Sequence, residues 1–90
     1  MKAEELRDLR VAILLQLYTR QPLGRRAVAI HRLARSEVDC TEQDVAAQLA
    51  FLQGEKYVEP IKADDLAPGL DPFWVITSAG MKYCEEKHLI

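Results

Sequence analysis

One segment near the C-terminal end limits the fold of this chain more than any other. Phe73-Trp74-Val75-Ile76-Thr77 is an unbroken run of aromatic and β-branched residues, which is typical of a β-strand. Residues 57–62 form a second candidate strand, in which Pro60 favours an edge position because proline cannot donate a ladder hydrogen bond. We therefore expect an antiparallel β-hairpin, with residues 63–71 as its loop.

The rest of the chain is predicted to be helical. Apolar residues repeat at helical spacing through residues 3–20, and Gln21-Pro22-Leu23-Gly24 interrupts the pattern. Two more helices are expected at about residues 25–36 and 41–53, and a short one is expected to end near residue 87. The expected buried stripes are Leu6, Leu9, Ile13 and Leu17 in the first helix, Ala27, Ile30, Leu33 and Ala34 in the second, and Val45, Leu49 and Leu52 in the third.

Caps define two of these helices. Thr41 with Asp44 three residues later resembles a capping box, and Gly54 is expected to stop the same helix. Thr77 or Ser78 is expected to cap the last helix. Ninety residues suffice for one domain, so the sequence predicts a single unit over residues 1–90. Its fold class is α+β, mainly α: three helices and a hairpin closing one core, followed by a short helix.

Charge is distributed unevenly along the chain, although the net charge is only −2. Residues 20–35 contain five arginines and no acid, whereas residues 37–59 contain six acids and one lysine. A run of arginines on one helix either contacts phosphates or forms a solvated face. Docking of this basic face on the acidic face of a second copy is a third interpretation.

Two runs in the second half resemble winged-helix domains. V-A-A-Q-L-A-F-L-Q-G-E-K-Y-V (Val45–Val58) is similar to their third helix and its entry into the first wing strand, and W-V-I-T-S-A-G (Trp74–Gly80) to the second wing strand and helix cap. The resemblance covers nearly the whole chain and matches small bacterial and phage helix-turn-helix proteins in length. It implies binding to duplex DNA, with the third helix in the major groove.

The resemblance also implies a set of DNA contacts. Arginines of the second helix would contact phosphates, and Gln43 and Gln48 would read adenine edges. The third helix itself carries no lysine or arginine, and Glu42 and Asp44 lie at its N-terminal end. The candidate contacts are Arg25, Arg26, Arg32, Arg35, Gln43, Ala47, Gln48 and Lys62. A small transcriptional regulator, acting as a dimer, is the function that these contacts would serve.

The alternative function is a winged-helix protein-interaction module that uses the third helix and the wing without binding DNA. Phe51 with Ala47 and Ala50 would form an exposed apolar patch on that helix. The opposing interpretation places Phe51 under the wing or against the first helix. A partner protein and a homodimer both remain open at this stage.

No enzymatic activity, cofactor or metal is expected. The chain has no glycine-rich phosphate loop and no nucleophile motif. Cys84 and His88 stand four residues apart, but two ligands do not make a metal site. Cys40 and Cys84 are expected to be reduced thiols, which fits a cytoplasmic protein. We expect no membrane association, because Val11–Leu15 is the longest purely apolar run and is far too short to span a bilayer.

Overall fold

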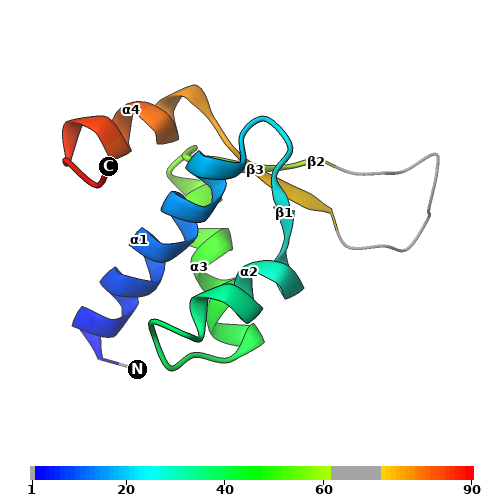
Figure 1. The fold of residues 1–90 in the computed structure, drawn as a ribbon, viewed down its shortest axis with the longest axis vertical. Helices are drawn as coiled ribbons and strands as arrows, with labels where there is room; N and C mark the ends of the chain where they lie inside the picture. The colour runs from blue at the N-terminus through cyan, green and yellow to red at the C-terminus, as the bar shows by residue number, and fades with distance from the viewer. Residues whose placement is uncertain (1, 62–71) are drawn as a thin grey trace.

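The computed structural model describes residues 2–61 and 72–90 (Figure 1). The fold is α+β and mainly helical, as predicted, and its arrangement is compatible with a winged helix. Figure 1 shows α1, α2 and α3 grouped together, with β2 and β3 extending to one side and α4 at the C-terminal end. The elements are α1 (Ala3–Arg20), β1 (Arg25–Arg26), α2 (Ala27–Ala34), α3 (Glu42–Gly54), β2 (Val58–Ile61), β3 (Phe73–Ile76) and α4 (Ser78–Glu86).

The sheet has three antiparallel strands in the order β1-β3-β2. The pairing of β2 with β3 confirms the predicted hairpin, and Pro60 lies on an edge strand, as expected. Strand β1 was not expected. Arg25 pairs with Trp74 and Arg26 with Phe73, so the predicted second helix of residues 25–36 is wrong at its start. This helix begins at Ala27 and ends at Ala34.

Gly24 makes the approach of β1 to β3 feasible. Its φ of 73° lies in the left-handed region that residues other than glycine rarely adopt. A Cβ atom at this position would also overlap the carbonyl oxygen of Trp74 and the Cγ1 atom of Val75. The Gln21–Gly24 interruption is therefore the turn that brings the chain from α1 onto the sheet.

The core lies where α1, α2, α3 and the sheet meet. Leu9, Ile13 and Leu17 of α1 are fully buried, which confirms most of the first predicted stripe, although Leu6 is only half-buried. The predicted stripe of α3, formed by Val45, Leu49 and Leu52, is also confirmed, with exposed fractions of 2% or less.

The predicted stripe of α2 is partly wrong. Ile30 and Ala34 are buried and Ala27 is half-buried, but the side chain of Leu33 is 45% exposed. A helix of eight residues packs one narrow stripe against its neighbours, and here Ile30 and Ala34 form that stripe at i, i+4 spacing. Leu33 lies to one side of it, next to the groove between α1 and α2.

Caps fix both ends of α3. The backbone N–H of Asp44 donates to Thr41 Oγ1 at 3.1 Å, and the backbone N–H of Thr41 donates to Asp44 Oδ2 at 2.8 Å, which confirms the capping box. Helix α3 ends at Gly54, one residue later than predicted. The left-handed residue that turns the chain is Lys56 rather than the glycine, with φ 66°.

The C-terminal turn of α3 is a Schellman motif. The N–H of Tyr57 bonds the carbonyl of Leu52, and the N–H of Lys56 bonds the carbonyl of Gln53, both at 2.9 Å. Thr77 Oγ1 donates to the carbonyl of Lys56 and accepts from the N–H of Gly80. Thr77 is therefore the cap of α4 that the sequence left open between two residues, and it also ties α4 to the end of α3.

Candidate functional site

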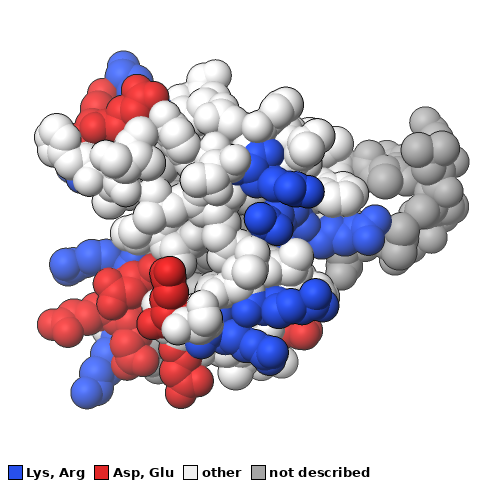
Figure 2. Space-filling model, viewed as in Figure 1, with Lys and Arg blue, Asp and Glu red and all other residues white. Residues whose placement is uncertain are grey.

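Arginine side chains of β1 and α2 form the largest cluster of like charge among the candidate residues. We call Arg25, Arg26, Arg32 and Arg35 the basic surface. Figure 2 shows Lys and Arg side chains gathered over β1 and α2, and acidic side chains gathered over the N-terminal end of α1 and the connection from α2 to α3. The acids over the N-terminal end of α1 lie outside the acidic stretch of residues 37–59, so this grouping in space joins acids from two parts of the chain.

The two arginines of β1 are held by the sheet. Arg25 and Arg26 are half-buried, and the Arg26 guanidinium carbon lies 4.8 Å from the centroid of the Phe73 ring. Both Nε atoms are buried and have no hydrogen-bond acceptor among the described residues. A buried Nε atom cannot reach a ligand in solvent, so any contact of these side chains with an outside acceptor would come from the terminal nitrogens of the guanidinium.

Arg32 lies in α2, and Arg35 is the C-cap residue that follows this helix. Both side chains are exposed. Within residues 2–61 and 72–90, the one ion pair joins Lys82 to Glu86 on α4, at 3.8 Å. No arginine of the basic surface is thus paired with a described acid, and its positive charge is uncompensated within that part of the chain.

Helix α3 presents an outward face of small, uncharged side chains. Gln43, Ala46, Ala47 and Ala50 are exposed on it. A shallow cavity of about 400 Å³ lies between this helix, α2 and β3, with Val28, Gln43 and Trp74 among its lining residues. Trp74 of β3 is half-buried and packs against the core.

The two acids at the start of α3 have different surroundings. The Asp44 carboxylate accepts the backbone N–H of Thr41, and this hydrogen bond, together with one from the Thr41 side chain, lowers the pKa of Asp44. Glu42 is exposed and lines the shallow cavity between α2 and α3. Glu42 is therefore the acid that a ligand on the outward face of α3 would meet.

Gln48 is not a surface residue. Its side chain is only 8% exposed, and its Oε1 atom accepts a hydrogen bond from Arg10 Nε of α1 at 2.6 Å. The expected role of Gln48 in reading an adenine edge is therefore wrong. Position 48 lies three residues after Val45 and four before Leu52, so helical spacing places it beside the buried stripe, and the long Arg10 side chain supplies its partner.

Phe51 is neither fully exposed nor fully packed against α1, so each of the two interpretations made from the sequence is met in part. Its side chain is 44% exposed, while the Arg10 guanidinium of α1 stacks on its ring at 4.1 Å from the centroid. Ala47 and Ala50 are exposed, as expected. Arg10 was not among the candidate residues. Its position one helical turn from Leu6 and Leu14 gave no signal of a partner on α3.

The remaining candidates are the charged residues of the wing loop and the potential metal ligands. Lys62, and the wing-loop acids Asp64, Asp65 and Asp71, lie outside the described residues. No group of three potential metal-ligating side chains occurs within the described ranges. Cys84 is fully buried, and His88 lies beyond the end of α4 with φ 56°, as the left-handed residue of a second Schellman motif.

Both cysteines are free thiols. Burial raises the pKa of Cys84 and of Cys40, with smaller contributions from neighbouring acids. The thiols are therefore protonated at neutral pH, and neither has the lowered pKa that is typical of a nucleophilic cysteine. His31 is half-buried, with its Nε2 atom 2.9 Å from the carbonyl oxygen of Cys40.

Among the helices in the described part of the chain, none has the length and the apolar character needed to cross a bilayer. Comparison of the chain with protein-family models, with curated proteins and with solved structures finds no match.

Proposed function

We propose that this chain is a winged-helix domain that binds duplex DNA, with the basic surface on the phosphate backbone and α3 in the major groove. The order of helices and strands and the antiparallel three-stranded sheet support this proposal. Within it, the biological role is that of a small transcriptional regulator.

The observation that carries the proposal is the basic surface itself. Its four arginines come from adjacent elements and have no acidic partner among the described residues. Phosphate contacts supply nearly all sequence-independent affinity for DNA, and the planar guanidinium suits phosphate oxygens. In helix-turn-helix docking the helix before the recognition helix crosses the backbone, which is the place that α2 would take.

The outward face of α3 suits close approach to a groove. Ala46, Ala47 and Ala50 keep the helix narrow, and Gln43 supplies an amide that can bond both N6 and N7 of adenine. Because α3 carries no cation, this helix would add selectivity rather than charge. The affinity would depend on the basic surface and would fall steeply as salt rises.

The test is fluorescence anisotropy with a mixed-sequence duplex, titrated at low and at moderate salt. Four phosphate contacts predict a slope of log affinity against log salt of roughly −3 to −4. The triple variant Arg25→Glu, Arg32→Glu, Arg35→Glu should lose binding. The double variant Arg32→Glu, Arg35→Glu changes only exposed side chains and should lose most of it without disturbing the strand.

A matched control reverses three exposed cations elsewhere: Lys2→Glu, Lys82→Glu and Lys87→Glu. This control changes the net charge by the same amount as the triple variant, so it should retain more affinity if the position of the arginines matters. Equal losses of DNA affinity in the triple variant and in the control would mean that affinity depends on net charge alone. Absence of binding by the unaltered protein at low salt would refute the proposal.

A protein-interaction module is the second candidate function. The exposed ring of Phe51, next to the uncharged outward face of α3, favours it. This alternative predicts that Phe51→Arg disrupts a complex while Arg32→Glu has a smaller effect, and DNA binding predicts the reverse order. Failure of DNA binding at low salt would make this candidate the leading one.

A further inference from the structure

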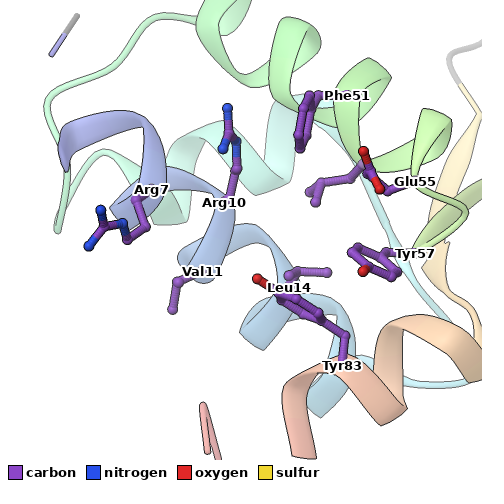
Figure 3. A pocket seen from close by; sticks show the side chains of 9 residues that line it. Arg7, Arg10, Val11, Leu14, Phe51, Glu55, Tyr57 and Tyr83 are labelled. Carbon is purple, nitrogen blue, oxygen red and sulfur yellow. The ribbon is translucent and has the colours of Figure 1, made fainter. Parts of the chain in front are cut away.

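A cavity of about 400 Å³ lies between α1, α3 and α4, and no arginine of the basic surface lines it. Figure 3 shows the side chains that line it. No residue of β1 or α2 contributes to its wall. Its volume lies in the range of small-molecule sites, and such sites are mostly apolar with a few well-placed polar groups.

Aromatic rings form two sides of this cavity. The rings of Tyr57 and Tyr83 stack with their centroids 4.6 Å apart and their planes 26° from parallel. Phe51 lies on the other side, and Figure 3 shows it next to Arg10 and facing the two tyrosines across the cavity. All three aromatic side chains are at least partly accessible, so a planar ring placed between them would cover apolar surface that water now meets.

Arg10 is the polar group that is held in place in this cavity. Its Nε donates to Gln48 Oε1 at 2.6 Å, and its guanidinium carbon lies 4.1 Å from the centroid of the Phe51 ring. These two contacts fix the plane of the guanidinium. Among the described residues Arg10 donates a hydrogen bond through Nε alone, which leaves the N–H groups of its two terminal nitrogens for a ligand.

The other charged groups lie at the edge of the cavity. Arg7 is one turn before Arg10 on α1, and its exposed side chain points outward at the rim in Figure 3. Glu55 lies on the side opposite Arg10, beside Tyr57. The lining therefore carries two cations and one acid, which favours a ligand with a single negative charge at its Arg10 end.

We propose that this cavity binds a small aromatic carboxylate. The carboxylate would accept two parallel hydrogen bonds from the terminal nitrogens of Arg10, a bidentate arrangement that Arg–carboxylate pairs frequently adopt. The ring would lie between Phe51 and the stacked pair of Tyr57 and Tyr83. A cationic ligand would meet Arg7 and Arg10, and a neutral one would accept only weaker hydrogen bonds from Arg10.

The test is a titration of the ¹⁵N-labelled protein followed by two-dimensional NMR, at constant ionic strength, with benzoate, benzyl alcohol and benzylamine as probes. Benzoate should shift amide signals of residues 51–57 and 83 in a saturable way. Benzyl alcohol has nearly the same shape without the charge and should bind at least about tenfold more weakly, since hydrogen bonds to a charged group are the stronger ones. Benzylamine should not bind.

Variants test the role of Arg10. Arg10→Met keeps an unbranched apolar chain and removes the guanidinium, and it should weaken benzoate binding at least about tenfold. Because this change also leaves Gln48 without its donor, Phe51→Leu provides an independent variant with a partly exposed side chain, and it should weaken binding as well. Lys82→Met, an exposed cation of α4 outside the cavity lining, should leave binding unchanged.

Three results would overturn this inference. Benzyl alcohol could bind as tightly as benzoate, benzoate shifts could be scattered and unsaturable, or Arg10→Met and Phe51→Leu could both bind like the unaltered protein. None of these results depends on DNA, so the inference can fail while the proposed function stands, and the reverse also holds.

Discussion

Helices α2 and α3 are neighbours in the chain and in the core, but they differ in how they begin and in what they expose. Helix α3 starts at a capping box formed by Thr41 and Asp44. Helix α2 has no side-chain cap at its start and follows directly on strand β1. The start of α3 is thus fixed by residues within one turn, and the start of α2 by pairing with a strand almost fifty residues away.

The features expected of a DNA-binding surface are distributed over these two helices. Helix α2 and the strand before it carry the arginines, while α3 carries small uncharged residues and an exposed acid at its start. If the proposed function is correct, affinity and selectivity are therefore separable in this protein. Substitutions in α2 should change binding to every sequence, and substitutions in α3 should change the preference among sequences.

The largest expected difference between the two helices concerns their leucines. Leu49→Ala in α3 removes a side chain that is 1% exposed, which should lower the free energy of unfolding by about 2–5 kcal/mol. Leu33→Ala in α2 removes a side chain that is 45% exposed, and the change should stay within about 0.5 kcal/mol. Urea unfolding measures both. Equal losses would mean that Leu33 is buried in solution.

The second difference concerns two glutamines of α3. Gln48→Ala deprives the Arg10 guanidinium of its acceptor and should cost about 1–3 kcal/mol in the free energy of unfolding. Gln43→Ala alters an exposed side chain and should cost less than about 0.5 kcal/mol. Thermal or urea unfolding of the two variants measures both losses of stability. A larger loss for Gln43→Ala would contradict the placement of these residues.

A third test concerns the start of α3. Thr41→Ala removes the acceptor for the Asp44 N–H and should destabilise the protein by about 1 kcal/mol. The corresponding position of α2, Arg26, has no side-chain cap to lose, although it stacks on Phe73. Helix content measured by circular dichroism during urea unfolding should show the loss for Thr41→Ala. An unchanged unfolding midpoint would mean that the capping box does not stabilise α3.

The capping box also predicts a pH dependence. Hydrogen bonds from Thr41 hold the pKa of Asp44 below its ordinary value of 3.8 in the folded state. A lowered folded pKa means that the ionised carboxylate stabilises the fold fully above about pH 3.8, and that this contribution is lost as the pH falls through the lower folded value. The stability difference between the unaltered protein and Asp44→Asn should therefore shrink on acidification. A constant difference between pH 2 and 7 would disprove this.

The smallest expected effect concerns Glu42 at the start of α3. If α3 enters the groove, Glu42→Gln should raise DNA affinity about twofold at low salt, because it removes one exposed charge that repels phosphate. Glu4→Gln is a matched control, since Glu4 is also an exposed acid in the first turn of a helix. Anisotropy titrations compare the two. A larger gain from Glu4→Gln would place the DNA elsewhere.

Local patterns were sufficient for much of this fold. The stripe of α3 and its capping box were correctly predicted, because each depends on residues within one or two turns. The run from Phe73 to Ile76 was correctly predicted as a strand, since its composition is extreme. Strand β1 was missed, because two arginines have no composition typical of a strand and form one only where Gly24 lets them reach Trp74.

The candidate sites divide in the same way. The sequence by itself determined that the arginines are concentrated in one short stretch and that α3 has no cation, because charge and helical spacing can be read directly from the residues. Only the tertiary structure decided that Gln48 is buried, that Arg10 contacts both Gln48 and Phe51, and that Tyr57 stacks on Tyr83. These contacts join residues 26 to 41 positions apart, and such distances have no local signature, since they depend on how whole helices pack.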